Sequence, residues 1–546
     1  MTISDTPRPT LLILSGAYCN ADLAAEFGTL PPAFLPIGNR RLYESQIELA
    51  ETLGANVVLT LPGDFDPKPE DISKLDAAGV RVIYTPTALS LSEACYFALE
   101  ILNLTGPLFV LFGDTLVECN APATLDCAWT HITEDYFNWA DTFEDPQGRV
   151  SFVHGYGDGR SPRKVACGYF GISNPEMFIK SLRTSASFMD AVNYYSATQG
   201  MVQQHPKVWY DFGHLSLFYR SKRMILVSRA FNNMRSDGVS VVKSSSDGSK
   251  MLAEADWFAT LPRRLMPFVP QYFGMGHQDG KTFYELEYLY HPILNELFVY
   301  GNLPIYVWRR ILGRCMEFLE TCQTIRPTVK EIPDLDAFAQ QTYDQLIVQK
   351  TFDRVNDFLT ARGWSKDHTV CVNGWHSPGL AQVAEDLIKL VPPTTRDHIS
   401  FWHGDFFFGN IFYDFRSSRI KVIDPRGGAQ RDKRSHFGDW RYDFAKLSHS
   451  VMGGYDLILA NYGQFEVHSD SDFALILPQT TPFLDIKADF QTYKVGHLSA
   501  NSPEITALTA LLFLTMLPLH AENTRRQDMF LANALLIYRD LVEPPK

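Results

Sequence analysis

Residues 403–427 have the sequence HGDFFFGNIFYDFRSSRIKVIDPRG and follow the short apolar run HISFW. The apolar stretches on either side of RSS predict two strands joined by a hairpin turn. Asp405 and Asn410 lie on the turn that precedes the first strand, and Asp424 follows the second strand. A hairpin of this length returns Asp424 to the side of Asn410. The stretch therefore predicts two acids and an asparagine at one site.

These residue types suit phosphoryl transfer. That reaction needs little covalent help from the protein, because catalysis consists mostly of positioning and of neutralising the phosphate charge around magnesium. It requires an acid that accepts the proton of the attacking hydroxyl, and an asparagine and a second acid that hold the metal ions. Asp405, Asn410 and Asp424 supply these types in this order. The alternative is an apolar hairpin that carries incidental polar residues.

The pattern H-G-D-x-x-x-x-N, followed by a hydrophobic strand and I-D, resembles the catalytic signature of the aminoglycoside phosphotransferase and choline kinase superfamily. The resemblance implies ATP as phosphoryl donor, Asp405 as catalytic base, and Asn410 and Asp424 as ligands of Mg²⁺. It also implies that His403 is a structural neighbour of the loop. Asp443, in the later segment DWRYDFAKLSHS, is expected to stabilise the start of a helix through backbone N–H groups.

A kinase of this kind also needs a cation for the phosphates that are not transferred, held by an acid on a helix. Lys243 lies in the strand-like segment VSVVKSS, and Glu254 follows on the helical segment SKMLAEADWF. We expect these two side chains to form an ion pair. An exposed lysine at the edge of a sheet is the alternative.

The segments around Lys243 predict a small lobe with strands ahead of a helical lobe. Residues 224–231 and 238–245 are expected to form a hairpin, residues 249–261 a helix and residues 281–291 another strand. Long helices dominate from residue 303 onward. The pattern predicts a two-lobed α+β domain, and the resemblance makes it protein-kinase-like. We place this domain at residues 226–546, with the first lobe at about 226–300 and the helical lobe at about 301–546.

The first part of the chain alternates short apolar runs with helical ones. Strands are expected at residues 10–16, 55–63, 80–85 and 107–114, and helices at 41–54 and 91–102. Continuous apolar strands separated by helices predict a parallel sheet that is covered on both faces. We expect a doubly wound α/β domain over residues 1–225, with ligands at the carboxyl ends of the strands.

This first domain resembles the sugar-phosphate nucleotidyltransferases over roughly residues 10–225, on the segments LPIGNRRLYESQI, VLFGD, KVACGYFGI and VWYDFGH. The resemblance implies that Asp114 and Asp211 together hold Mg²⁺ on a nucleoside triphosphate. The alternative is that both are structural acids at turns.

The phosphate-binding loop departs from the pattern of that family. The loop keeps only Gly16 of the expected glycines, and Pro32 stands where a catalytic lysine is expected. Either Arg40 or Arg41 would replace that cation, or the domain binds a nucleotide or sugar phosphate without fast transfer. Lys164 is a candidate contact for a substrate phosphate, and a surface lysine at the start of a strand is the alternative.

Composition narrows the class of protein. The net charge is −13 and no run of lysine and arginine is present, which argues against a nucleic-acid partner. The eight cysteines form no C-x-x-C pair, as expected in a reducing cytoplasm. The N-terminus lacks the pattern of a signal peptide, and the apolar segment 505–520 is short enough to be a core helix. We therefore expect a cytoplasmic protein with no membrane insertion.

Together these patterns predict a bifunctional activating enzyme. The second domain would phosphorylate a small hydroxyl compound, a sugar or an amino alcohol, with ATP. The first domain would couple the product to a nucleotide from a second nucleoside triphosphate and release pyrophosphate. By resemblance such pairs serve surface-polysaccharide or head-group synthesis. The sequence points to no particular acceptor, nucleotide or oligomeric state.

Two other functions stay open at this stage. The first is a kinase whose N-terminal domain is a degenerate module that binds nucleotide or nucleotide-sugar and regulates or scaffolds. The second is an interaction protein built from two inactive enzyme folds, which would leave the complete signature at residues 403–424 without a use.

Overall fold

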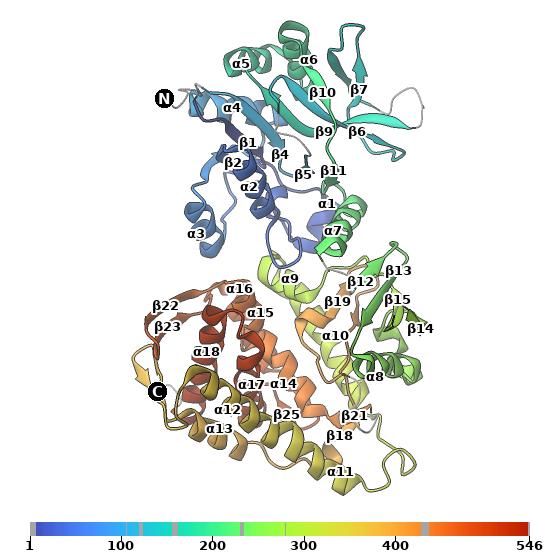
Figure 1. Ribbon diagram of the computed structural model, residues 1–546, viewed down its shortest axis with the longest axis vertical. Helices are drawn as coiled ribbons and strands as arrows, with labels where there is room; N and C mark the ends of the chain where they lie inside the picture. Colours follow the sequence, from blue (N-terminus) through green and yellow to red (C-terminus); the bar gives the residue numbers. More distant parts are fainter. Residues whose placement is uncertain are drawn as a thin grey trace. The chain divides into compact units, whose positions relative to one another are not determined.

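The structure is a computed structural model, and its described residues divide into two compact units (Figure 1). It describes residues 7–104, 106–119, 124–155, 162–229, 234–278, 280–426 and 436–543. The first unit comprises residues 1–225 and 300–302, and the second comprises residues 226–299 and 303–546.

The first unit is built on a mixed sheet with the strand order β10-β6-β9-β4-β1-β2-β3. Its strands on this path are β1 (Thr10–Leu14), β2 (Asn56–Pro62), β3 (Arg81–Thr85), β4 (Leu108–Phe112), β6 (Cys127–Thr133), β9 (Arg163–Ile172) and β10 (Val202–Gln204). Strands β1, β2, β3 and β4 pair in parallel, as the sequence predicts. The prediction of a wholly parallel sheet is wrong for the rest of the sheet, because β9 lies between β4 and β6 and is antiparallel to both.

Both faces of this sheet are buried. Along β1, Leu11 and Ile13 belong to one apolar cluster, and Leu12 and Leu14 belong to another. The alternation follows from the two-residue period of a strand, which sends successive side chains to opposite faces. The first six helices of this unit are α1 (Ala21–Phe27), α2 (Leu42–Leu53), α3 (Pro69–Ala77), α4 (Leu91–Leu102), α5 (Pro175–Thr184) and α6 (Phe188–Gln199). The predicted helices at 41–54 and 91–102 match α2 and α4.

A short two-stranded ribbon brings two distant segments of the first unit together. Strand β5 (Thr115–Glu118) pairs antiparallel with β11 (Val208–Asp211), and Asp211 lies opposite Thr115. A second ribbon of β7 (Asp141–Glu144) and β8 (Val150–Val153) joins the main sheet through β9. The helix α7 (Leu215–Arg229) follows β11 and covers most of residues 224–231. The prediction of a strand there is wrong, because a short apolar run fits a buried helix as well as a strand.

The second unit begins with a four-stranded antiparallel sheet, in the order β12-β13-β15-β14. The strands are β12 (Met234–Ser236), β13 (Ser240–Ser245), β14 (Tyr272–Gln278) and β15 (Lys281–Glu287), and α8 (Gly248–Ala259) lies between β13 and β14 in the chain. Helix α8 packs on this sheet through contacts with β13, β14 and β15. The predicted strands at 238–245 and 281–291 and the predicted helix at 249–261 match β13, β15 and α8.

Helices dominate the rest of the second unit (Figure 1). They are α10 (Ile305–Gln323), α11 (Leu335–Thr342), α12 (Lys350–Arg362), α13 (Leu380–Lys389), α14 (Trp440–Val451), α15 (Tyr455–Leu459), α16 (Thr481–Gln491), α17 (Pro503–Met516) and α18 (Thr524–Val542), with α9 (Leu294–Tyr300) ahead of them. Helix α17 contacts α12, α13, α14 and α18, as expected of a core helix. Residues 503–520 are long and apolar enough to cross a membrane by length and composition, yet 61% of that window is buried inside the protein.

Short strands interrupt the helices where the sequence predicts the catalytic hairpin. Strand β18 (Ile399–Phe401) pairs with β21 (Phe437–Asp439), and β19 (Ile411–Asp414) forms an antiparallel hairpin with β20 (Arg419–Val422). Residues 403–410, which we call the catalytic loop, connect β18 to β19. The hairpin and its position match the prediction, because a turn and two flanking apolar runs are local features of the sequence.

Candidate active site

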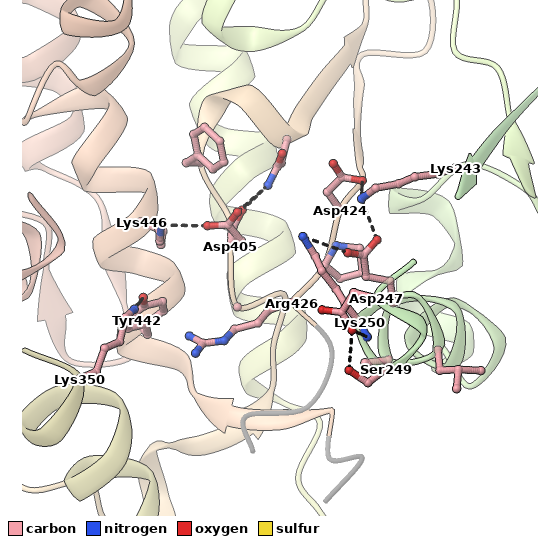
Figure 2. Close-up of a pocket in the computed structure, with 17 residues that line it drawn as sticks. Lys243, Asp247, Ser249, Lys250, Lys350, Asp405, Asp424, Arg426, Tyr442 and Lys446 are labelled. Carbon is pink, nitrogen blue, oxygen red and sulfur yellow. Dashed lines mark hydrogen bonds and ion pairs between the residues drawn. The ribbon is translucent and has the colours of Figure 1, made fainter. Parts of the chain in front are cut away.

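A cleft of about 640 Å³ lies in the second unit, and polar side chains from separate elements line it (Figure 2). Lys243 comes from β13 and Glu254 from α8, while Asp405 lies on the catalytic loop. Asn410 ends that loop, and Asp424 follows β20. The structure therefore brings all five residues predicted for the phosphotransferase site to one cleft.

Asp405 and Asn410 face each other across the catalytic loop. The side-chain amide of Asn410 donates hydrogen bonds to the main-chain oxygen of Asp405 at 2.9 Å and to its carboxylate Oδ2 at 3.1 Å. The main-chain N–H of Ile423 donates to the carbonyl oxygen of Asn410 at 3.0 Å. This bond places the residue before Asp424 against Asn410, which is the arrangement that the spacing predicts.

His403 ties the catalytic loop to the end of the hairpin. Its side chain is fully buried. Nδ1 accepts a hydrogen bond from the main-chain N–H of Asp405 at 3.2 Å, so Nε2 carries the proton and donates to the carbonyl of Ile423 at 2.9 Å. Burial lowers the pKa of His403 to about 4, which keeps the ring neutral. His403 therefore has the structural place that the resemblance implies.

Asp443 braces the same loop from α14. Its carboxylate is buried and accepts hydrogen bonds from the main-chain N–H groups of His403 at 2.7 Å and Gly404 at 2.8 Å. Burial raises the pKa of Asp443 to about 7. Asp443 lies in the first turn of α14 and is stabilised by backbone N–H groups, as predicted, but these groups belong to the catalytic loop. The N-cap of the helix is Asp439, which accepts from the N–H of Arg441 at 3.0 Å.

Gly404 is required where the catalytic loop turns. Its φ angle is +78°, and a Cβ atom there would lie 2.7 Å from Cβ of Arg426. Gly404→Ala should therefore destabilise the fold through both a left-handed backbone and a steric overlap, by about 2–5 kcal/mol in total. Denaturant unfolding of the full chain measures this cost.

Gly374→Ala is the matched control for that variant. Gly374 has a similar φ angle of +77°, but a Cβ atom there would meet nothing within 4 Å. This variant should lose only the backbone term, about 1–2 kcal/mol. Equal losses of unfolding free energy in the two variants would contradict the close packing between Gly404 and Arg426.

The predicted ion pair between Lys243 and Glu254 is present. Nζ of Lys243 lies 2.8 Å from Oε2 of Glu254 and 2.8 Å from Oδ1 of Asp424. Burial opposes the charge of this lysine, but the two carboxylates outweigh it and raise its pKa above the ordinary value. Tyr284 donates a further hydrogen bond to Glu254 at 2.8 Å. Lys243 is thus held between two acids, and the alternative of an exposed edge lysine is excluded.

The backbone at Asp424 is held in an unusual conformation. Its φ angle is +55°, in the left-handed region that residues other than glycine rarely adopt. Residues held in such conformations cluster at functional sites, where the surrounding structure maintains them. Here the conformation points the carboxylate at Lys243, which Oδ1 of Asp424 contacts (Figure 2).

Lys446 and Lys350 are cations of the cleft that the motif did not single out. Lys446 lies on α14, and its Nζ is 2.9 Å from Oδ1 of Asp405. Burial raises the pKa of the Asp405 carboxyl, but the ammonium of Lys446 outweighs that effect and the pKa lies below its ordinary value. Lys350 lies on α12 and donates to the hydroxyl of Tyr442 at 2.9 Å. The sequence could have indicated Lys446, because it lies three residues after Asp443 and therefore on the same helical face. No pattern in the sequence points to Lys350.

Asp424 and Asn410 fit the ligand chemistry of Mg²⁺, which prefers oxygen donors and keeps several waters. The amide nitrogen of Asn410 is bound to Asp405, which leaves its carbonyl oxygen as the ligand atom. Oδ1 of Asp424 contacts Lys243. Within the described ranges no group of three or more His, Cys, Asp or Glu could hold a metal ion, so phosphate oxygens and water would complete the coordination.

The first unit contains a smaller cavity, of about 240 Å³, to which Asp114 and Asp211 both contribute. The main-chain N–H of Phe212 donates to the carbonyl of Asp114 at 2.9 Å, which fixes the two acids side by side. Trp139 donates to the carboxylate of Asp211 at 2.7 Å. Burial and the negative charge of Asp211 raise the pKa of Asp114 to about 7. Burial also raises the pKa of Asp211. Two neighbouring buried carboxylates with raised pKa values are a candidate functional site.

The cations predicted for this first site lie elsewhere. Arg41 is buried, donates from Nη2 to Asp71 at 2.9 Å, and donates from Nη1 to the carbonyl of Phe34 at 2.7 Å. This corrects the prediction that Arg41 could replace the missing lysine, because its guanidinium is committed to a structural ion pair. Arg40 binds Glu48 at 2.5 Å.

Lys164 and Gly16 also have structural partners. Nζ of Lys164 donates to the side chain of Gln203 at 3.0 Å. Gly16 packs against Thr85, whose Oγ1 would lie 2.4 Å from a Cβ atom at this position. Among the described residues that line the 240 Å³ cavity, none is lysine or arginine, and neither Lys164 nor Gly16 is among them.

Comparison with known proteins gives matches to solved structures only. No model of a protein family and no curated protein sequence matches the chain. HddC from Yersinia pseudotuberculosis has 15% identity and a TM-score of 0.30, over 40% of this chain and 100% of its own. The inositol-1-phosphate CTP transferase from T. maritima has 14% identity and a TM-score of 0.31, over 40% of this chain and 96% of its own. An aminoglycoside-3'-phosphotransferase of type VIII has 13% identity and a TM-score of 0.31, over 54% of this chain and 97% of its own.

The similar structures thus include nucleotidyltransferases and aminoglycoside phosphotransferases, which match different portions of the chain. Because TM-scores of 0.30 and 0.31 are too low to support an argument about function, any functional assignment has to rest on the side chains of this protein.

Proposed function

We propose that the second unit is an ATP-dependent phosphotransferase that acts on a small hydroxyl compound. The observation that carries the proposal is the convergence of Asp405, Asn410 and Asp424 on one cleft with the Lys243–Glu254 ion pair. Each of these side chains has a chemical use in phosphoryl transfer. Loss of ATP-dependent phosphorylation in Asp405→Asn is the test.

Asp405 would accept the proton of the acceptor hydroxyl as the phosphoryl group arrives. The hydrogen bonds from Asn410 fix the direction of its carboxylate. Lys446 keeps the carboxylate ionised and adds a positive charge where the transferred phosphate develops negative charge. A strong base is not required for this role, because the transition state of phosphoryl transfer is loose and depends mainly on positioning.

Mg²⁺ bound at this site would neutralise the phosphate oxygens of ATP and hold them in line with the acceptor. Asp424 and Asn410 are the residues that would hold it. Lys243 supports this arrangement from the opposite side, because it is bound to both Glu254 and Asp424. Loss of the lysine would remove the cation that lies between these two carboxylates and leave Glu254 with the longer ion pair to Lys250, at 3.8 Å.

We further propose that the first unit transfers a nucleotidyl group to the phosphorylated product and releases pyrophosphate. The support is the pair of Asp114 and Asp211 at one cavity, a carboxylate pair that could hold a divalent cation on a nucleoside triphosphate. Two consecutive steps in one chain are chemically reasonable, since the product of the first is the substrate of the second.

A kinase with a nucleotide-binding or nucleotide-sugar-binding first unit is the second candidate function. The observation in its favour is that no lysine or arginine is found among the described residues lining the 240 Å³ cavity. A triphosphate in a site without such cations would lack part of the charge neutralisation that fast transfer needs.

Pyrophosphate release separates these two functions. The wild-type protein, given Mg²⁺, the phosphorylated acceptor and each of CTP, GTP, UTP and ATP in turn, should release pyrophosphate with at least one nucleotide. Asp114→Ala should lower that rate on the order of 100-fold or more, because it removes one of the two proposed carboxylate ligands of the cation.

Asp76→Ala is the matched control, since Asp76 is exposed on α3 and lies outside the cavity. An active kinase that releases no pyrophosphate with any of the four nucleotides would favour the second candidate. Wild-type rates of release in Asp114→Ala would refute the assignment of this acid to the metal.

A further inference from the structure

A second cavity, of about 210 Å³, adjoins the phosphotransferase cleft at Asp405. The two share Lys350, Asp405, Tyr442 and Lys446, together with one phenylalanine. The residues proposed for ATP and Mg²⁺, Lys243, Glu254, Asn410 and Asp424, line only the larger cleft. Asp405 thus lies between the cleft proposed for the nucleotide and the second cavity. An acceptor in the second cavity would have its hydroxyl group next to Asp405.

The charges around this second cavity are mostly positive. Asp405 is the one carboxylate among the described residues that line it, and Lys446 already pairs with it at 2.9 Å. Lys350 donates to the neutral hydroxyl of Tyr442 at 2.9 Å. Arg426 lines the larger cleft and not the second cavity. Its guanidinium lies over the rings of Trp402 and Tyr442, 5.9 Å from each centroid, and extends toward Tyr442, which lines both spaces (Figure 2). In the described part of the chain, neither Lys350 nor Arg426 pairs with a carboxylate.

This surplus of positive charge acts on neighbouring groups. Burial raises the pKa of the Tyr442 hydroxyl, but Lys350, Lys446 and Arg426 outweigh it and lower the pKa to about 8. Burial also lowers the pKa of Lys350. Lys350 is half-buried, and a cation withdrawn from water without a counter-ion is unfavourable unless something else compensates it, whereas Arg426 is exposed. The arrangement is therefore suited to receive an anion between Lys350 and Arg426.

The remaining wall of the cavity suits a carbon skeleton. Tyr455, Leu512, Met516 and Leu519 line it. His449 is buried there against Phe513, at 4.0 Å between ring centroids, and both of its ring nitrogens lack a hydrogen-bond partner within the described residues. An unsatisfied buried polar side chain in the wall of a cavity is a candidate contact for a ligand hydroxyl.

We propose that the acceptor is an anion, a hydroxyl compound that carries a carboxylate or a phosphate held by Lys350 and Arg426. The inference rests on the proposed phosphotransferase function and specifies its substrate class. It disfavours a cationic acceptor such as an amino alcohol or an aminoglycoside, because Asp405 is the single carboxylate available on this side within the described chain.

The transfer itself follows from this placement. The acceptor hydroxyl oxygen forms a bond to the γ-phosphorus of ATP, and the bond from that phosphorus to the bridging oxygen breaks. ADP leaves with the electron pair of the broken bond, and the hydroxyl proton passes to Asp405. The anionic group of the acceptor takes no part in bond making and fixes only its orientation.

Matched acceptors test the substrate class. ADP formation would be measured with Mg²⁺-ATP and three series: glycerol, glycerate and glycerol 3-phosphate; glucose, glucuronate and glucose 1-phosphate; and the cations choline and ethanolamine. We expect an anionic compound to be the best acceptor, and comparison of the carboxylates with the phosphates shows which anionic group the site prefers.

The Lys350→Gln variant tests the proposed anion contact. It should raise KM for the best acceptor by about 10–100-fold, the value of a charge-assisted hydrogen bond, and leave KM for ATP unchanged.

Lys389→Gln is the matched control, because Lys389 is 66% exposed on α13. A rise in KM for ATP instead of the acceptor would assign Lys350 to the nucleotide and overturn the inference. Faster phosphorylation of neutral or cationic members would also overturn it while leaving the phosphotransferase function intact.

Thermal unfolding gives a readout that does not need turnover. In the presence of Mg²⁺-ADP, glucuronate or glucose 1-phosphate should raise the Tm of the wild type more than glucose does, and this difference should vanish in Lys350→Gln. Absence of any anion-specific shift in the wild type would overturn the inference. Absence of ADP formation with every acceptor, alongside a clear anion-specific shift, would count against the proposed phosphotransferase and not against the anion site.

Discussion

Replacement of Asp405 by asparagine should lower kcat for ATP-dependent phosphorylation by about 10²–10⁴-fold. Asparagine has the same shape and can still contact Asn410, but it cannot accept the proton of the acceptor hydroxyl. It also leaves Lys446 without the carboxylate that lies 2.9 Å from its Nζ. KM for ATP should change little, because Asp405 faces the acceptor side of the cleft. Steady-state ADP formation at saturating Mg²⁺-ATP measures both quantities.

Asp485→Asn is the control for loss of one negative charge, since Asp485 is exposed on α16. It should keep wild-type kinetics. Circular dichroism and thermal unfolding of Asp405→Asn should show a folded protein, which separates a chemical defect from a structural one. A folded Asp405→Asn variant with the wild-type kcat would exclude Asp405 as the base and with it the proposed mechanism.

The catalytic loop could be predicted from the sequence because every part of it is local. A turn and two apolar strands bring Asp405, Asn410 and Asp424 together within one short segment. The Lys243–Glu254 pair could be predicted for a similar reason, since a strand and the following helix place them close together. Lys350 comes from α12, far from the motif in sequence, and only the packing of the helical lobe brings it to Tyr442.

In the first unit, the pattern of apolar residues predicts the strands but not the direction of every strand. Continuous apolar runs identify β1, β2, β3 and β4, and the parallel pairing of these strands follows from the helices between them. The antiparallel direction of β9 depends on long-range pairing, which the pattern of buried residues does not encode. From the sequence alone, Arg41 is a reasonable candidate for a phosphate contact, but in the fold its guanidinium pairs with the buried Asp71. A charge in sequence does not reveal whether its counter-ion is a ligand or the protein.

Asp424→Asn should affect a different part of the same reaction. Its carboxylate is the proposed charged ligand of Mg²⁺ and the partner of Lys243 at 2.8 Å. Loss of this charge should lower kcat/KM for Mg²⁺-ATP on the order of 100-fold or more. It should also raise the Mg²⁺ concentration required for half-maximal activity. Titration of Mg²⁺ at fixed ATP measures the second effect, and equilibrium binding of Mg²⁺-ADP measures the loss of nucleotide affinity.

The comparison of Asp424→Asn with Asp405→Asn is the sharpest test of the site, because each removes one negative charge from the same cleft. If the two acids have the proposed roles, only Asp424→Asn shifts the Mg²⁺ dependence, and Asp405→Asn lowers kcat at every Mg²⁺ concentration. Lys243→Met should lower nucleotide affinity as Asp424→Asn does, since Lys243 contacts Asp424 and not Asp405. An equal shift of the Mg²⁺ dependence in both acid variants would mean that Asp405 also binds the metal, and the division between base and metal ligand would then fail.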